Sequence, residues 1–179
     1  MEIPQTGFCI HLKRDRQEQV RGRVRTVGDY ECYWNGSRLR DLSGQILEPG
    51  GPGDNTSSVG GNYDRRVEAG IYPLFIQNGT RYKTYDYSDD GSRPNPGLLL
   101  GSTEERVAIL IHPGSGFLSS EGCLNPASGN RGPASAINFA GSREKVIEFI
   151  EVMKEKLGAR FPASGRIPGA VIVIEGEPG

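Results

Sequence analysis

The chain has 179 residues and a formal net charge of −1, so its length fits one domain, residues 1–179, with a core of its own. Its positive residues are scattered, which argues against nucleic-acid binding, and no segment reaches the ~18 apolar residues of a membrane span. The first residues lack the basic and apolar regions of a secretory signal, so we expect synthesis in the cytoplasm. The 26 glycines, about twice the usual share of roughly 7%, indicate a turn-rich β protein.

The first third of the chain predicts short strands joined by polar turns. β-forming residues gather at Phe8–Leu12, Val24–Val27 and Tyr30–Trp34, and Asn35-Gly36 is a strong hairpin signal. Residues 48–64 are rich in glycine, proline and serine, which predicts a flexible surface loop. The roughly 50 residues before this loop are too few for a separate domain, so we place it inside a single domain.

The second half of the chain contains longer apolar runs. Val67–Ile76 predicts a glycine turn that leads into a strand, and Asn78-Gly79 marks a second hairpin. Val107–Ile111 is apolar throughout, which predicts a central strand buried on both faces. Ala170–Ile174 predicts another buried strand.

Residues 142–158 predict one amphipathic helix. Ser142 is expected to cap its start and Gly158 to close it. Five apolar residues fall on one stripe that would pack on the sheet: Val146, Phe149, Ile150, Met153 and Leu157. The predicted fold is therefore mostly β, a barrel-like or sandwich sheet with one helix packed against it.

The three cysteines are an odd number, which argues against a disulfide scaffold. Cys9 and Cys32 lie in strand-like sequence, where burial as small residues is favoured, although they can pair if their strands are neighbours. His11, between two aliphatic residues, is expected to be structural or at the surface. Neither Cys-x-x-Cys nor His-x-x-x-His spacing occurs, so we expect no metal and no other cofactor.

One histidine and one cysteine form a candidate catalytic pair. His112 ends the apolar run, and Cys123 follows eleven positions later in a loop that contains glycine. A free thiol has a pKa of about 8.5, so it needs a base to become a good nucleophile at neutral pH. A histidine at a strand end and a thiol on the following loop suit acyl transfer by a cysteine enzyme. We expect that the carbonyl of Pro113, the residue after the histidine, can orient the imidazole.

The segment Ser120-Glu121-Gly122-Cys123-Leu124-Asn125 resembles the signature of the L,D-transpeptidases, Ser-His-Gly-Cys followed by an aliphatic residue and often Asn or Arg. Glu68-Ala69-Gly70-Ile71-Tyr72 is similar to the strand entry that precedes this signature in the family, and His112 lies upstream of the cysteine as the family's base does.

The chain also resembles a group of small phage and bacterial proteins of uncharacterised function. The shared features are Leu47-Glu48-Pro49, the Ala-Gly-x-Tyr strand, Ile-His-Pro-Gly before Gly-Cys, and a helix that starts at Ser142-Arg143. Together these resemblances cover residues 47–157.

The resemblance implies a mechanism and a set of site residues. His112 would take the proton of Cys123, whose thiolate attacks the carbonyl of the third residue of a peptidoglycan stem peptide and expels D-alanine. A thioester on Cys123 then passes to an amine, as in an L,D-transpeptidase, or to water, as in an L,D-carboxypeptidase. Oxyanion stabilisation and substrate binding are assigned to Gly122, Ser120, Glu121, Asn125, Tyr72 and Arg143.

The missing export signal and the resemblance together suggest a route to the periplasm by phage or by type VI-like secretion. A secreted antibacterial effector of this kind implies an immunity protein as a partner.

Two other classes of protein stay open. Glu121 stands where the family has histidine, which keeps open a non-catalytic wall-binding or phage structural module that retains the fold. A cytosolic thiol hydrolase acting on a different amide needs the same pair of residues and another groove.

Overall fold

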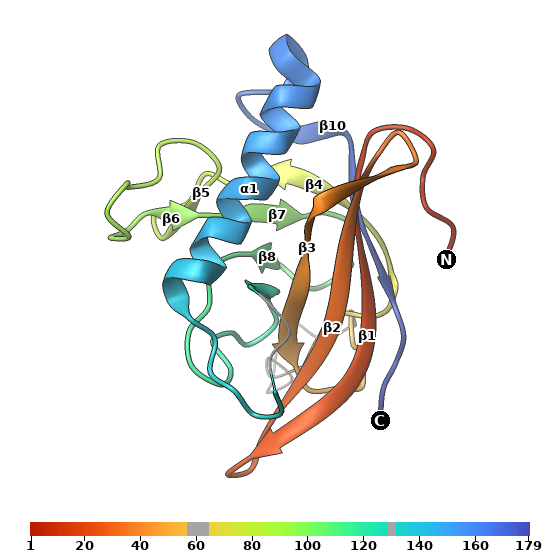
Figure 1. Ribbon diagram of the computed structural model, residues 1–179, viewed down its shortest axis with the longest axis vertical. Coiled ribbons are helices and arrows are strands. Elements are labelled where there is room, and N and C mark those ends of the chain that lie inside the picture. The colour runs from red at the N-terminus through yellow and green to blue at the C-terminus, as the bar shows by residue number, and fades with distance from the viewer. Residues whose placement is uncertain (57–64, 129–131) are drawn as a thin grey trace.

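The computed structural model describes residues 1–56, 65–128 and 132–179. Its strands are β1 (Phe8–Val20), β2 (Arg23–Trp34), β3 (Ser37–Pro49), β4 (Gly70–Ile76), β5 (Tyr82–Lys83), β6 (Asn95–Pro96), β7 (Leu98–Leu100), β8 (Leu110–Ile111), β9 (Asn125–Ala127) and β10 (Arg166–Glu175); the helix α1 (Phe139–Leu157) is followed by a 3₁₀ turn, Gly158–Arg160. One sheet has the order β8-β7-β4-β10-β1-β2-β3-β9 and curls into a nearly closed barrel, while β5 and β6 pair separately (Figure 1). The predicted mostly β fold with a barrel-like sheet and one packed helix is confirmed for the described residues.

Three long antiparallel strands, β1 to β3, form the most regular part of the sheet. The predicted hairpin at Asn35-Gly36 is confirmed, with φ of 48° and 75°, a backbone that asparagine and glycine tolerate and that matches the strand twist. The two strands predicted within residues 24–34 are one continuous strand, β2, because β1 and β3 hydrogen-bond to it on both sides.

Strand β10 lies in the middle of the sheet, parallel to β1 and antiparallel to β4, which confirms the buried strand predicted at Ala170–Ile174. The register of β1 against β2 decides whether the two N-terminal cysteines can pair. Cys32 lies opposite Ile10, whereas Cys9 lies opposite Tyr33, so the two thiols face opposite sides of the sheet. Both are buried and free, and they form no disulfide.

The central strand predicted at Val107–Ile111 is wrong. Only Leu110 and Ile111 form a strand, β8, at the end of the sheet, and Val107 is 78% exposed. Ala108 has a φ of 55°, a left-handed conformation that breaks the extended chain before β8. The apolar run therefore divides into an exposed entry and a short buried strand.

Helix α1 begins three residues before the predicted Ser142 cap. Asn138 is the true cap, and its side chain accepts a hydrogen bond from the Gly141 amide at 2.9 Å. Ser142 is buried instead, and its hydroxyl accepts a hydrogen bond from the Gly114 amide at 2.9 Å. The Gly158 end is confirmed.

The predicted stripe of α1 is also confirmed: its five residues are buried in the same core as the inward-facing residues of the sheet. The ring of Phe149 meets Tyr30 of β2 edge to face, with the ring centroids 5.2 Å apart. The helix thus crosses the barrel (Figure 1). Its apolar side chains share one core with those of the sheet.

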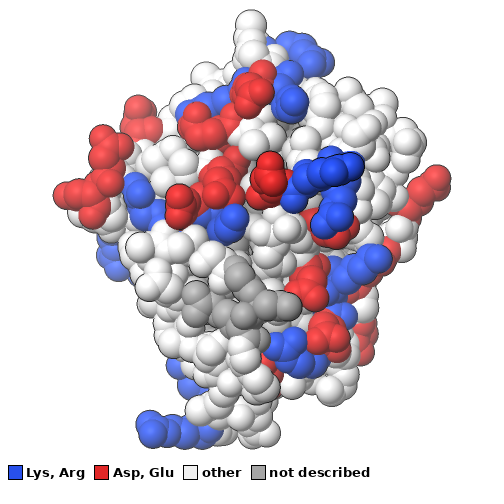
Figure 2. Space-filling model, in the orientation of Figure 1, with Lys and Arg blue, Asp and Glu red and all other residues white. Residues whose placement is uncertain are grey.

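Part of the predicted loop at residues 48–64 is strand, because Glu48 and Pro49 belong to β3 and pair with β2. Residues 57–64 lie outside the described part of the chain. No helix within the described residues is long and apolar enough to cross a membrane. On the face that Figure 2 shows, acidic and basic side chains are interspersed.

Candidate functional site

The two ends of the sheet are joined by a bridge, which we call the seam. The His112 amide donates to the Leu124 carbonyl at 3.1 Å, and the Leu124 amide donates to the Leu110 carbonyl at 2.8 Å. Ile111 and Leu124 pair in parallel and are completely buried, so the hydrophobic effect favours closure here. His112 comes directly after β8 and Cys123 directly before Leu124, so the seam holds both residues on neighbouring segments.

The imidazole of His112 is buried and fixed in one orientation. Its Nδ1 lies 2.8 Å from the Pro113 carbonyl oxygen, which can only accept, and 3.3 Å from Asn125 Nδ2, so the shorter contact assigns the proton to Nδ1 and makes Nε2 the basic nitrogen. This confirms the role predicted for the Pro113 carbonyl. The Tyr82 ring stacks on the imidazole, with centroids 4.2 Å apart and planes inclined by 28°. Burial, assisted by the charge of Arg81, lowers the pKa of His112 to about 4, so the imidazole is neutral near pH 7.

The thiol of Cys123 is half-buried and held by the entry to β8. The Leu110 amide donates to Sγ at 3.3 Å, and the thiol donates to the Ala108 carbonyl oxygen, 3.6 Å away. Ala108, whose carbonyl oxygen accepts this hydrogen bond, is the residue with the left-handed φ before β8. Burial raises the pKa of Cys123, and the Leu110 amide and the Arg106 charge offset only part of this effect. The resting pair is therefore a neutral thiol and a neutral imidazole, with no hydrogen bond joining them among the described residues.

The loop before Cys123 is fixed from two sides. The Ser120 hydroxyl donates to the Cys123 carbonyl oxygen at 2.7 Å. A buried guanidinium, that of Arg106, lies against Gly122, where an added Cβ would be 2.2 Å from its Nη2. Only glycine lets the loop lie this close. Neither the Gly122 amide nor the Cys123 amide donates a hydrogen bond to any residue that the structure describes, so both N–H groups keep their donor capacity.

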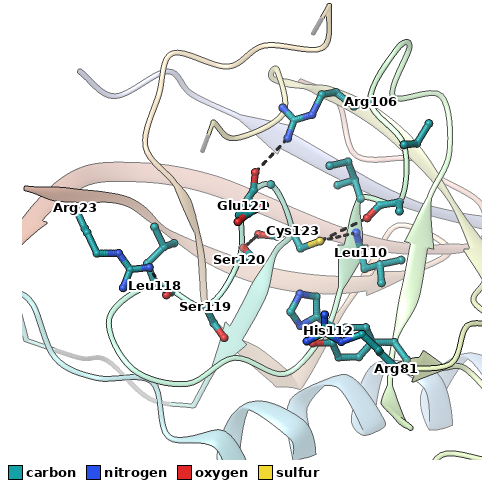
Figure 3. A pocket seen from close by; sticks show the side chains of 15 residues that line it. Arg23, Arg81, Arg106, Leu110, His112, Leu118, Ser119, Ser120, Glu121 and Cys123 are labelled. Atoms are coloured by element: carbon teal, nitrogen blue, oxygen red, sulfur yellow. Dashed lines mark hydrogen bonds between the residues drawn. The ribbon is translucent and has the colours of Figure 1, made fainter. Parts of the chain in front are cut away.

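Arg106 ties this loop to two other segments. Its Nη1 donates to the Asp54 carbonyl oxygen at 2.8 Å, and its Nη2 donates to the carbonyl oxygens of Arg65 at 3.2 Å and Glu121 at 3.5 Å. Figure 3 shows Arg106 reaching down to the loop that carries Glu121 and Cys123. The loop before Cys123 is thus held by the Arg106 guanidinium, whose N–H groups donate to backbone carbonyls of three segments.

A cavity of about 620 Å³ opens over Cys123 and His112. Its described lining contains three arginines, Arg23, Arg81 and Arg106, and one carboxylate, Glu121. Arg23 and Arg81 lie on opposite sides of the Cys123 sulfur in Figure 3. The cavity therefore carries a net positive charge, although the chain as a whole has a net charge of −1.

The seam brings together most of the predicted site residues. The cavity is lined by Cys123, His112, Gly122, Ser120 and Glu121. Asn125 does not line it, but lies fully buried behind the histidine, and its Nδ2 donates to the His112 carbonyl oxygen at 2.9 Å. Asn125 thus supports the base from behind and does not face the cavity.

Two predicted residues lie away from the cavity. Tyr72 is buried in the barrel core, where its hydroxyl accepts a hydrogen bond from Asn55 Nδ2 at 2.9 Å and donates to the Glu68 carbonyl oxygen at 2.7 Å. Arg143 donates to the Ser88 carbonyl oxygen and lies over the Tyr87 ring. The resemblance placed both at the site because it matched their segments, whereas the fold turns their side chains elsewhere.

Sequence reasoning missed the three arginines and the stacking tyrosine of the cavity: Arg23, Arg81, Arg106 and Tyr82. Tyr82 was one of several tyrosines without a distinguishing pattern, and the arginines come from three separate segments. The dipeptide Arg81-Tyr82, a cation beside an aromatic residue two positions after the Asn78-Gly79 turn, was the only local signal.

Within the described residues, no group of three or more His, Cys, Asp or Glu is arranged to hold a metal ion. Comparisons with models of protein families, with curated proteins and with solved structures found no match to this chain.

Proposed function

We propose that this protein is a cysteine-dependent acyl transferase that acts on peptidoglycan stem peptides, with an L,D-transpeptidase-like fold. The observation that carries the proposal is the seam, which sets the Cys123 thiol and the basic Nε2 of His112 on one cavity while Pro113 fixes the imidazole. A nucleophile, a base and a third group that orients the base are the minimum set for covalent catalysis.

The reaction begins when Cys123 gives its proton to Nε2 of His112 and Sγ attacks the carbonyl carbon of the third stem residue. The free amides of Gly122 and Cys123 bind the oxyanion; one such donor typically contributes about 2.7–4 kcal/mol. The C–N bond then breaks, the imidazolium returns the proton to the leaving amine, and D-alanine departs from a Cys123 thioester. An amine acceptor takes the acyl group to form a cross-link, and water releases it as an acid.

The remaining features have supporting roles in this reaction. Ser120 holds the Cys123 carbonyl, and Asn125 holds the His112 carbonyl, so both reacting groups are fixed through their own backbones. Glu121 is exposed at the cavity, and in the resemblance to the L,D-transpeptidase signature it stands where that signature has histidine. We further propose delivery to the periplasm by phage or a type VI-like system, with an immunity protein as partner.

The test uses purified stem tetrapeptides, with and without an amine acceptor, and the variants Cys123→Ser and His112→Gln. Mass spectrometry follows the release of D-alanine, the acylated protein and any dimer. We expect turnover and a thioester on Cys123 in the wild type, no thioester in Cys123→Ser, and a large loss of rate in His112→Gln.

Unchanged peptides with the wild-type protein would contradict the proposed reaction. Binding to purified cell walls without turnover, equal in wild type and Cys123→Ser, would indicate the non-catalytic wall-binding module instead. Circular dichroism of each variant checks that it is folded.

A further inference from the structure

Arg81 lies at the histidine end of the cavity. It directly precedes Tyr82, whose ring stacks on the imidazole of His112, and its side chain lines the cavity (Figure 3). Its charge is close enough to contribute to the lowered pKa of His112. Arg81 forms no ion pair with any carboxylate of the described residues.

Arg23 lies at the other end of the cavity and makes a useful contrast. Its Nη2 donates to the Leu118 carbonyl oxygen at 2.7 Å, so part of its donor capacity is already used. Arg81 has no such bond within the described chain. A guanidinium matches the geometry of a carboxylate, with two parallel N–H donors, so Arg81 is the better placed to receive a carboxylate from a ligand.

The chemistry of the proposed reaction fixes which part of the donor lies at this end. The imidazolium that forms when Cys123 loses its proton must return that proton to the nitrogen of the leaving amine. The leaving residue therefore lies beside His112, and the acyl part extends away from it. The α-carboxylate of that residue is separated from the reacting nitrogen by a single carbon, so it lies at the same end of the cavity.

We propose that Arg81 is a specificity-determining residue, whose guanidinium binds the free carboxylate of the residue that leaves. This inference rests on the proposed function and deepens it, because a donor that continues past the leaving residue has no carboxylate at this place. A bound carboxylate also cancels the repulsion between Arg81 and the imidazolium. The correct donor thereby makes His112 a stronger base at the moment when the proton moves.

The test compares three donors that differ only after the attacked carbonyl: a stem tetrapeptide with a free carboxylate, the same peptide with a C-terminal amide, and the peptide extended by one residue. We measure kcat and KM for wild type, Arg81→Gln, Arg81→Lys and Arg21→Gln. Arg21 lies in the exposed turn between β1 and β2 and does not line the cavity, so its variant controls for the loss of one positive charge.

The wild type should prefer the free acid over the amide by about 10- to 100-fold in kcat/KM, the range of a hydrogen bond to a charged group. Arg81→Gln should reduce this preference to a few-fold while it still turns over the amide, Arg81→Lys should restore part of it, and Arg21→Gln should behave as the wild type.

Equal rates of the wild type on acid and amide, or an unchanged preference in Arg81→Gln, would overturn the assignment of Arg81 and leave the proposed function intact. If no donor reacts with the wild type, both the function and the assignment fail. Because Arg81 is exposed, its variants are expected to fold, and thermal unfolding checks this.

Discussion

Two groups of arginines in this protein have opposite surroundings. The paired arginines are buried side chains that meet carboxylates: Arg14 with Glu48, Arg25 with Glu18, and Arg66 with Glu177. The cavity arginines, Arg23 and Arg81, line the cavity over Cys123 and meet no carboxylate of the described residues. The first group connects segments that are far apart in the sequence, and the second presents its charge to the cavity.

The difference shows how one residue type serves two purposes. A buried guanidinium is tolerable only when carboxylates and carbonyls use its donors, so each paired arginine fixes its neighbours in place. An exposed guanidinium beside a cavity keeps its donors for a ligand and changes the ionisation of nearby groups, as Arg81 does for His112. The two groups should therefore respond to mutation in opposite ways.

The largest effect is expected where a buried pair is broken. Arg14 and Glu48 form two parallel hydrogen bonds, of 2.9 and 2.8 Å, with both side chains almost completely buried. Glu48→Ala would remove the buried carboxylate from this guanidinium and leave Glu177, which is 43% exposed, as its remaining acidic partner, so it should lower the free energy of unfolding by about 3–5 kcal/mol. Urea unfolding followed by circular dichroism measures this.

The control is Glu31→Ala, which breaks an exposed pair with Arg38 and should cost about 1 kcal/mol or less. Arg81→Gln should likewise stay within about 0.5 kcal/mol of the wild type. A loss in Arg81→Gln as large as that in Glu48→Ala would remove the distinction between the two groups.

The next effect concerns pH. His112 has a pKa of about 4 in the folded protein against an ordinary 6.5, so between these values the unfolded chain binds a proton that the folded chain does not. The stabilisation is complete above pH 6.5, and about 3 kcal/mol is lost as the pH falls from 6.5 to 4. The difference in stability between wild type and His112→Gln should shrink by this amount over that window.

Arg81→Gln sharpens this second prediction, because it removes a charge that lowers the His112 pKa. NMR titration of the imidazole should give a higher pKa in Arg81→Gln than in the wild type, and no change in Arg38→Gln. An unchanged pKa in Arg81→Gln would mean that the cavity arginine does not act on the base.

A smaller effect is expected at the contact between Gly122 and Arg106. The new Cβ in Gly122→Ala would lie 2.2 Å from Nη2 of Arg106, whose guanidinium as a whole donates to three backbone carbonyls, so the loop or the guanidinium must move. We expect a loss of about 1–3 kcal/mol in stability and slower thioester formation. Gly132→Ala, with open space around the added Cβ, is the matched control and should change neither quantity.

Local sequence patterns predicted the parts of the fold that depend on neighbouring residues. Asn35-Gly36 forms its hairpin because these two adjacent residues adopt positive φ. The apolar stripe of the helix could be predicted because the spacing of its residues along the sequence matches the helical repeat. The prediction of a strand at Val107–Ile111 was wrong because the first residues of this run lie outside the barrel. Their position depends on the place of β8 at the end of the sheet, which a local pattern does not contain. Hydrophobicity alone does not distinguish a core strand from the apolar rim of a cavity.

The candidate site divides in the same way. Cys123, Gly122 and His112 could be proposed because a short motif and the end of an apolar run marked them. Arg81 and Arg106 could not, because their role arises only when the seam closes and brings segments from three parts of the chain together. Tyr72 shows the reverse error, since its motif matched while its side chain turned into the core.

The smallest expected effect is on the chemical reactivity of Cys123, and it isolates the cavity charge from catalysis. Cys9 and Cys32 are buried completely, and burial raises the pKa of Cys9 to about 11, so the half-buried Cys123 should be alkylated first. Iodoacetate and iodoacetamide alkylate thiols in the same way but differ in charge. The quantity to measure is the alkylation rate with iodoacetate divided by the rate with iodoacetamide. This ratio in the folded protein, compared with the ratio for the same thiol in the urea-unfolded chain, measures the electrostatic potential at the sulfur.

This ratio should be higher in the folded protein, because cations on both sides of the sulfur attract the anionic reagent. Arg81→Gln and Arg23→Gln should each lower it by about two- to fivefold, and 1 M salt should nearly abolish the difference, since the screening length falls to about 3 Å. Arg38→Gln, whose arginine is already paired with Glu31, should leave the ratio unchanged. Equal ratios in all of these variants would mean that the charge of the cavity arginines does not reach the thiol, and an anionic substrate would then gain nothing from them.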